Sequence, residues 1–130
     1  MTTPVKLAWL IDDSEIDLRH YARVIDRSGL VEEVTTFTFA DEALAHLKAN
    51  PDLEVDLIFL DINIPRMNGF EFLEAATAEL GAGFAKVVVA MLTTSLNPRD
   101  REEAARFDVV KDFINKPLTV EHVENAVKHL

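Results

Sequence analysis

The sequence of 130 residues predicts an α/β fold, in which a doubly wound, five-stranded parallel sheet lies between two layers of helices. Apolar runs rich in β-branched residues alternate along the whole chain with segments whose apolar residues recur at helical spacing. The runs are apolar almost throughout, as is typical of strands buried on both faces of a parallel sheet. The connections are short, and parallel strands joined through helices have right-handed crossovers. We therefore expect one three-layer α/β/α domain over residues 1–130.

The first 50 residues predict two strands and two helices. Residues 5–11 form an apolar run, and residues 31–37 form a weaker run rich in threonine and valine. Residues 14–28 have a helical pattern that closes at Gly29. Residues 40–49 carry apolar side chains at positions i, i+3, i+4 and i+7 of a helix. The residues assigned to the apolar face of the first helix are Ile16, Tyr21, Val24 and Ile25.

The remaining residues repeat this alternation. Residues 55–60 and 86–92 are strongly β-like, and the second of these runs contains three consecutive valines. Residues 70–80 between them predict a helix that ends at a pair of glycines. The last three elements are a helix from Pro98 to about residue 107, a strand at residues 109–114, and a helix with Val120, Val123, Val127 and Leu130 along one face.

The composition excludes several classes of function. The sequence contains no cysteine, which excludes disulfide frameworks, thiol catalysis and zinc sites built on cysteine. The net charge of −10 argues against nonspecific binding to nucleic acid and favours a cationic partner or a site that gathers metal ions. The N-terminus has no secretion signal, and no apolar run approaches membrane-spanning length, so we expect a cytoplasmic protein that does not bind membranes.

Acidic side chains lie where two of the expected strands end. Asp12 and Asp13 follow the first strand, and Asp61 follows the third. If these strands are neighbours, three carboxylates meet at the edge of the sheet where open α/β folds bind ligands. Carboxylates that lie so close repel one another and need a cation, and oxygen ligands on loops suit Mg²⁺. The sequence therefore predicts a magnesium site at this edge.

The fourth and fifth strands add other groups to the same edge. The fourth is followed by Thr93, Thr94 and Ser95, and the fifth leads to Lys116. A carboxylate nucleophile, a divalent metal, a hydroxyl and an ammonium together suit phosphoryl transfer. Taken singly, each residue also has a structural explanation, since an acid at a strand end is commonly a helix cap and a lysine commonly lies on the surface. It is their combined spacing that favours the functional interpretation.

The stretch from Asp61 to Gly69, read together with these groups, resembles a known family. It has the order Asp-Ile-Asn-Ile-Pro-Arg-Met-Asn-Gly, and with the paired acids and the Lys-Pro dipeptide it is similar to the receiver domain of two-component response regulators, particularly the stand-alone chemotaxis type. The resemblance covers almost the whole chain and implies a flavodoxin-like sheet with the order 2-1-3-4-5. It also implies that Asp61 is the phosphoacceptor and that Pro65 and Gly69 are structural.

The resemblance implies roles for most of the other residues at this edge. Thr93 would be the switch hydroxyl, Lys116 would pair with the phosphate, and Phe113 would be the switch aromatic. A structural role with a cis bond is implied for Pro117. The implied metal ligands are Asp13 directly, Asp12 largely through water, Asp61, and the backbone carbonyl of Asn63.

The sequence departs from the family pattern in three places. Val109 and Val110 stand where Gly-Ala is usual, and the stretch between the hydroxyl and the lysine is one residue longer than is common. Both changes affect the fourth helix and the fifth strand. Thr94 replaces a smaller residue beside the phosphoryl pocket, so we assign Thr94 and Ser95 to the control of access.

These observations lead to one main hypothesis for function. The chain would be a single-domain response regulator with no output domain. It would accept a phosphoryl group from a sensor histidine kinase or a histidine phosphotransfer protein, and it would signal through protein contact or phosphorelay to an unidentified target, with a homodimer left open. It would catalyse only its own phosphorylation and dephosphorylation.

Two alternatives belong to other classes of function. One is an interaction module with the receiver fold that phosphorylation does not regulate. The other is a phosphohydrolase with an aspartyl-phosphate intermediate, but such enzymes need a second acid two residues after the nucleophile, and Asn63 stands there.

Overall fold

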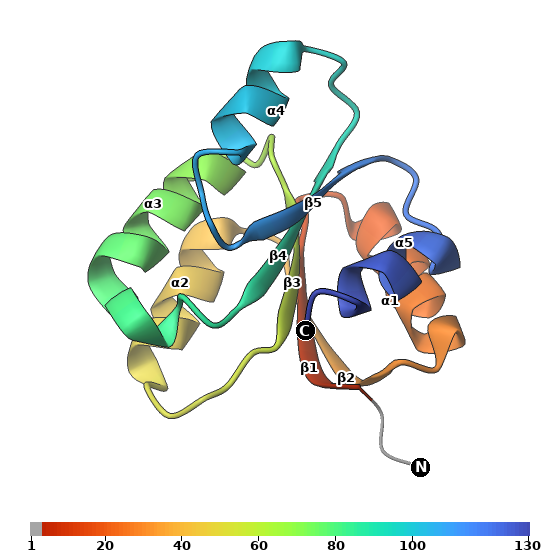
Figure 1. Cartoon of the computed structure of the whole chain (residues 1–130), viewed down its shortest axis with the longest axis horizontal. Coiled ribbons are helices and arrows are strands. Elements are labelled where there is room, and N and C mark those ends of the chain that lie inside the picture. The colour runs from red at the N-terminus through yellow and green to blue at the C-terminus, as the bar shows by residue number, and fades with distance from the viewer. Residues whose placement is uncertain (1–3) are drawn as a thin grey trace.

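The computed structural model describes residues 4–130 as five strands that alternate with five α-helices (Figure 1). A single 3-10 turn, η1 (Gly81–Gly83), follows the third helix. The strands are β1 (Val5–Ile11), β2 (Val31–Phe37), β3 (Leu57–Asp61), β4 (Val88–Thr93) and β5 (Val110–Asn115). The helices are α1 (Glu15–Ser28), α2 (Ala40–Ala49), α3 (Gly69–Leu80), α4 (Pro98–Ala104) and α5 (Val120–Val127).

All five strands run parallel in one sheet with the order β2-β1-β3-β4-β5. Figure 1 shows α1 and α5 on one face of the sheet and α2, α3 and α4 on the other. The expected flavodoxin-like, three-layer architecture is therefore confirmed. No helix within residues 4–130 is long and apolar enough to cross a membrane.

The hydrophobic core has two parts, one on each face of the sheet. Successive residues of β3 alternate between them: Ile58 and Leu60 pack toward α2 and α3, whereas Leu57 and Phe59 pack toward α1 and α5. Trp9 of β1 lies in the first part, where its ring centroid is 4.6 Å from that of Phe37. Because both faces are covered, the central strands are apolar at almost every position, as the sequence predicts.

The helix ends follow the capping chemistry of the sequence. The Ser14 side chain accepts a hydrogen bond from the backbone N–H of Asp17 and begins α1, and Gly29 ends this helix with a left-handed φ of 70°. Asn68 and Glu71 form a reciprocal capping box at the start of α3. These caps fix where the loops after β1 and β3 end, and thus position the carboxyl edge of the sheet.

The packing of α1 and α5 differs from the prediction at one residue each. Ile16 is 79% exposed, because the inward face of α1 consists of Leu18, Tyr21 and Ile25, and Ile16 lies about half a turn away from Leu18. Leu130 is exposed because α5 ends at Val127.

Some element boundaries also differ. Helix α4 ends at Ala104 rather than near residue 107, since the chain then tightens into i to i+3 hydrogen bonds. The last three strands begin one or two residues later than predicted and end one residue later. At β3 the cause is Asp56, whose side-chain Oδ2 accepts the backbone N–H groups of Lys6 and Leu7 at 2.9 and 3.2 Å. A side chain thus takes the place of a strand carbonyl there.

A β-bulge in β5 takes up one residue. Val110 pairs with Val89, but the next pair in the register joins Asp112 to Ala90, so Lys111 is left out. Beyond the bulge the register continues regularly to Asn115, which pairs with Thr93. The bulge therefore does not disturb the pairing at the end of β5.

We expect Asp56→Ala to lower the free energy of unfolding by about 1–2 kcal/mol, because two backbone N–H groups at the start of β1 lose their acceptor. Urea denaturation measures this change. The matched control is Asp52→Ala, an exposed carboxylate in the same loop, which should change stability by less than about 0.5 kcal/mol. Equal losses in the two variants would contradict the role of the Asp56 side chain.

Candidate functional site

Three carboxylates meet at the carboxyl edge of the sheet. Ile11 pairs with Leu60 across β1 and β3, so the next residues, Asp12 and Asp61, lie side by side. One carboxylate oxygen from each of Asp12, Asp13 and Asp61 lies within 4.8 Å of the others. Asp12 is fully buried and Asp61 is 5% exposed, whereas Asp13 faces solvent. The cluster therefore has two buried members and one at its open side.

Asp12 is held by donors on two sides. Its Oδ1 accepts the backbone N–H of Ser14 at 2.9 Å, and its Oδ2 accepts the Lys116 ammonium at 2.7 Å. The backbone N–H of Asp12 donates to the Phe37 carbonyl at 3.0 Å. Both oxygens of this buried carboxylate are thus satisfied, which fixes its orientation.

Lys116 brings a positive charge into the acidic cluster. It follows β5, and its backbone N–H donates to the Thr93 carbonyl at 2.9 Å. Its side chain is 10% exposed, and its ammonium lies 2.7 Å from Asp12, 3.2 Å from Asp17 and 3.6 Å from Asp61. The Lys116–Pro117 peptide bond is cis, which confirms that expectation.

The charges at the site shift one another's pKa values. Burial raises the pKa of Asp61 from 3.8 to about 6, and the nearby Asp12 charge adds to this rise while Lys116 opposes it. Burial also raises the pKa of Asp12, against the hydrogen bond from Lys116. Burial alone would lower the pKa of Lys116, but its hydrogen bond to Asp12 and the surrounding negative charge raise it instead. The site is therefore an acidic pocket with a permanently charged lysine.

The three hydroxyl residues after β4 differ in their environment. Thr93 ends β4 next to Leu92, the partner of Asp61 in the sheet, and it is fully buried. Its Oγ1 accepts the backbone N–H of Ser95 at 2.9 Å, so the hydroxyl proton is free to be donated elsewhere. Thr94 is exposed at the edge of the site, and Ser95 is half-buried. Thr93 and Thr94 thus occupy an inner and an outer position.

The loop after Asp61 requires a glycine at its end. A Cβ on Gly69 would lie 2.6 Å from the backbone carbonyl oxygen of Asp61, so any side chain there would push on the residue at the centre of the site. Arg66 has a left-handed φ of 73°, and its guanidinium lies 3.8 Å from the Phe39 ring centroid and 2.9 Å from an oxygen of Asp41. Contacts with α2 and with the residue before it therefore hold this loop.

Asn63 and Pro65 lie in the same loop. Asn63 is exposed, two residues beyond Asp61, and Pro65 is exposed as well. The backbone carbonyl of Pro65 accepts the N–H of Met67 at 2.9 Å in a tight turn. The metal role of the Asn63 carbonyl stays a prediction.

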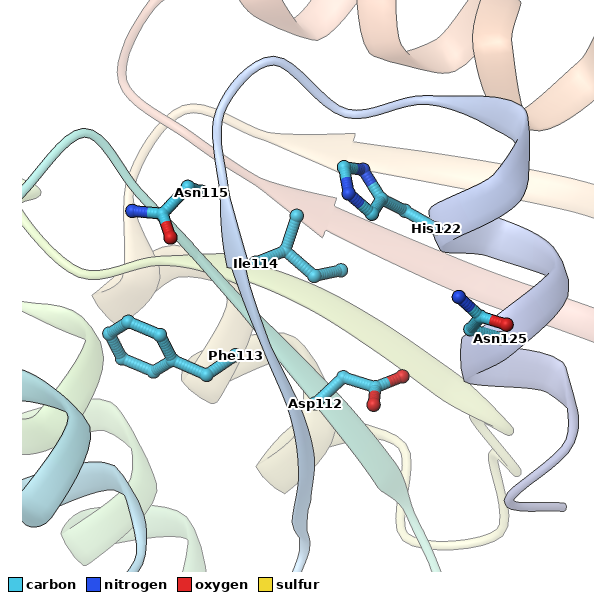
Figure 2. Close-up of a pocket in the computed structure, with 6 residues that line it drawn as sticks. All are labelled: Asp112, Phe113, Ile114, Asn115, His122 and Asn125. Carbon is cyan, nitrogen blue, oxygen red and sulfur yellow. The ribbon is translucent and has the colours of Figure 1, made fainter.

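Phe113 lies on β5, away from the acidic cluster. Figure 2 shows its side chain and that of Asn115 on one side of the strand, with Asp112 and Ile114 on the side that faces α5. The Phe113 ring is half-buried, and the guanidinium of Arg101 on α4 lies 4.8 Å from its centroid. A cavity of about 310 Å³, which none of the acidic cluster lines, is bounded by Asp112–Asn115 of β5 and by His122 and Asn125 of α5. The structure therefore places Phe113 beside α4 rather than in the site.

Two residues of α1 face the site, although the sequence pattern indicated only a packing role for Tyr21 and none for Asp17. Asp17 pairs with Lys116, and the ring centroid of Tyr21, one turn further on, lies 5.8 Å from the same ammonium. Their i, i+4 spacing puts them on one face of the helix, and this spacing was the available signal.

Two apolar side chains near the site edge of the fold are exposed: Ile16 in the first turn of α1, and Leu96 just before α4.

The donor set fits a hard divalent cation. Asp12, Asp13 and Asp61 supply carboxylate oxygens, which Mg²⁺ prefers, and the exposed side at Asp13 leaves space for water ligands. Burial is the main cause of the raised pKa values of Asp12 and Asp61, and Lys116 only partly opposes it, so a bound cation would favour the charged forms of both carboxylates. These residues could therefore hold Mg²⁺.

Comparison with known proteins gives one consistent answer. The family model described as the response regulator receiver domain matches residues 8–128. The chain is 30% identical to response regulator Rcp1 of Synechocystis sp. over 103 residues, which are 76% of this chain and 69% of that protein. It is also similar to the crystal structure of a two-component response regulator from Cytophaga hutchinsonii, with a TM-score of 0.89, 28% identity and 96% of each chain covered.

The chain is also similar to a further solved structure and to parts of several longer proteins. The chemotaxis protein CheY4 of Vibrio cholerae has a TM-score of 0.79 at 25% identity, with 96% of this chain and 98% of that chain covered. The chain spans only 7%, 34% and 20% of the length of three other curated relatives, which are therefore much larger proteins.

The raised pKa of Asp61 predicts how stability depends on pH without metal. Between about pH 4 and pH 6 the folded protein retains a proton at Asp61 that the unfolded chain has lost, so the free energy of unfolding falls as the pH rises through this window. We expect Asp61→Asn, which cannot ionise, to be more stable than the wild type by about 2 kcal/mol at about pH 7 and equally stable near pH 4. Urea denaturation in chelator measures both, and an equal difference at the two pH values would contradict the assignment.

Proposed function

Because the chain belongs to the family of response regulator receiver domains of two-component signalling, we propose that it accepts a phosphoryl group on Asp61 in a Mg²⁺-dependent reaction. The observation that carries this proposal is the environment of the Asp61 carboxylate. It is buried beside two further acids, and the Lys116 ammonium lies 3.6 Å away. Phosphoryl transfer explains this combination of a buried carboxylate, a candidate cation site and a fixed ammonium better than a purely structural role does.

The phosphoryl donor is a phosphohistidine on a kinase or a phosphotransfer protein. A carboxylate oxygen of Asp61 forms a bond to phosphorus, and the phosphorus–nitrogen bond breaks. The imidazole leaves with the electron pair and takes up a proton. Asp12, Asp13, Asp61 and the Asn63 carbonyl would hold Mg²⁺, which would neutralise negative charge on the phosphoryl oxygens. The Lys116 ammonium, 3.6 Å from Asp61, supplies a further positive charge.

Thr93 and Phe113 connect the site to the surface. The Thr93 hydroxyl accepts the Ser95 N–H, so its proton can be donated to a phosphoryl oxygen. Thr93 pairs with Asn115 where β4 and β5 end, so a movement of Thr93 would shift the end of β5. Phe113 lies on β5 two residues before Asn115 and would shift with it. The new charge would thus shift a two-state equilibrium that is read at the α4 side of the sheet.

The two other classes of function have less support. A phosphohydrolase of the aspartyl-phosphate type lacks its second acid, because the position two residues after Asp61 is Asn63. An interaction module without phosphorylation would need none of the buried charges that Asp12, Asp61 and Lys116 bring together. A single domain over residues 1–130, a cytoplasmic location, a homodimer and the downstream target stay predictions.

We expect acetyl phosphate with Mg²⁺ to add one phosphoryl group to the protein, because the groups around Asp61 suffice to react with a small donor. Intact-mass spectrometry measures the adduct. Asp61→Asn should form none, and Lys116→Ala should accumulate much less than the wild type.

The same experiment separates the three classes of function. A one-site adduct that is lost in Asp61→Asn supports the receiver. Continuous release of phosphate at many turnovers would support the hydrolase instead, and the absence of any adduct, also with beryllofluoride and Mg²⁺, would support the module without phosphorylation.

Thr94 should lengthen the lifetime of the phosphoryl group, because its exposed side chain adds bulk beside the pocket and hinders the approach of water. We expect Thr94→Ala to lose the phosphoryl group several-fold faster, measured as the decay of isolated phosphorylated protein. Thr94→Val, which keeps the bulk but removes the hydroxyl, is the control and should decay like the wild type. An unchanged decay in Thr94→Ala would show that bulk at this position does not limit access.

A further inference from the structure

Lys116 has a third acidic partner that the proposed chemistry does not use. Its ammonium lies 3.2 Å from Asp17 Oδ2, within hydrogen-bond distance, as well as 2.7 Å from Asp12 and 3.6 Å from Asp61. A lysine ammonium has three N–H donors. Asp12 and Asp17 accept hydrogen bonds from it, whereas Asp61 lies just beyond hydrogen-bond distance, so a further acceptor close to Asp61 competes with these two acids for the ammonium.

A phosphoryl group on Asp61 would be such an acceptor, and the partners of Lys116 differ in how easily they can be displaced. Asp12 is fully buried, so its carboxylate would be left as an uncompensated charge without the ammonium. Asp61 is the residue that carries the phosphoryl group. The side chain of Asp17 is 33% exposed and can be hydrated when the ion pair breaks. The Asp17 pair is thus the one that yields.

The position of Asp17 is set by the packing of α1. Its backbone N–H donates to the Ser14 side chain at 3.2 Å, and the next residue, Leu18, is buried in the core. Tyr21 is buried one turn further along the same face, with its ring near the Lys116 ammonium. The packing of the helix therefore holds the backbone of Asp17 beside the site, while its partly exposed side chain can leave Lys116 by a change of rotamer.

We infer that Asp17 is a positioning residue that competes with the phosphoryl group on Asp61 for the Lys116 ammonium. In the unphosphorylated protein it holds the ammonium on the side of α1. It thereby weakens the binding of a phosphoryl group or its analogue at Asp61 and shortens the lifetime of the phosphorylated state. This inference rests on the function proposed above, since it concerns the same site.

The chain offers a matched control for the charge of Asp17. Glu15 and Asp17 are both acidic residues in the first turn of α1, where a negative charge favours the helix N-terminus equally. Glu15 is exposed, and no ion pair joins it to Lys116 in the part of the chain that the structure describes. Asp17→Asn and Glu15→Gln thus remove the same charge, but only the first removes the competitor.

The test measures binding of beryllofluoride to Asp61 at saturating Mg²⁺ by calorimetry, and the decay of the phosphoryl group taken from acetyl phosphate. We expect Asp17→Asn to bind beryllofluoride about threefold to tenfold more tightly than the wild type, the scale of one partly exposed ion pair, and to hold the phosphoryl group longer. Glu15→Gln should remain within about twofold of the wild type. Asp17→Glu, which restores a carboxylate, should bring both values back toward the wild type.

Equal effects in Asp17→Asn and Glu15→Gln, or weaker binding in Asp17→Asn, would overturn the inference. Asp17→Ser removes the carboxylate in a second way and must behave like Asp17→Asn, and urea denaturation of each variant shows that it is folded. If the wild type itself takes up no phosphoryl group at Asp61, the proposed function fails. If it does and the matched variants agree with each other, only the role of Asp17 fails.

Discussion

The buried pair between Lys116 and Asp12 is the interaction on which the arrangement of the site depends. These residues are 104 positions apart, and their charged atoms lie 2.7 Å from each other in a place that solvent hardly reaches. An unpaired charge there would cost several kcal/mol, so the pair can persist only if both strand ends are held in register. The order β2-β1-β3-β4-β5 does this, since β3 and β4 fill the space between the strands that carry the two residues. Sheet topology and site electrostatics thus support each other.

Most of the fold could be predicted from the sequence because the spacing of apolar residues in a short segment indicates whether it forms a helix or a buried strand. Strands covered on both faces are apolar at almost every position, and the capping residues Ser14, Asn68 and Gly29 mark the helix ends. The predicted strand boundaries were less accurate where a side chain, rather than a backbone carbonyl, accepts the hydrogen bonds of the neighbouring strand. Asp56 accepts the N–H groups at the start of β1, so β3 begins later than its apolar run does. The hydrophobic pattern of the sequence does not show that a side chain acts as the hydrogen-bond acceptor there.

The residues of the candidate site were predicted through their chemistry and the resemblance, and the structure brings Asp12, Asp13, Asp61 and Lys116 together. The contact of Asp17 was missed for a physical reason. Two acids occur in the first turn of α1, and which of them faces Lys116 depends on how the helix is rotated on the sheet. That rotation is set by which apolar residues are buried, and the sequence analysis placed Ile16 rather than Leu18 on the inner face. The wrong placement of Ile16 and the missed contact between Asp17 and Lys116 thus both follow from the rotation of α1 on the sheet.

The bulge at Lys111 has a consequence for how this chain can vary in length. Because β5 is the last strand of the sheet and has a neighbour only in β4, an irregularity in it interrupts a single ladder. The paired residues beyond it, up to Thr93 and Asn115, keep their alignment. An extra residue in this part of β5 can therefore be absorbed before it displaces Lys116. A change of length at this outer border of the sheet thus disturbs one ladder, whereas a change in a central strand would disturb two.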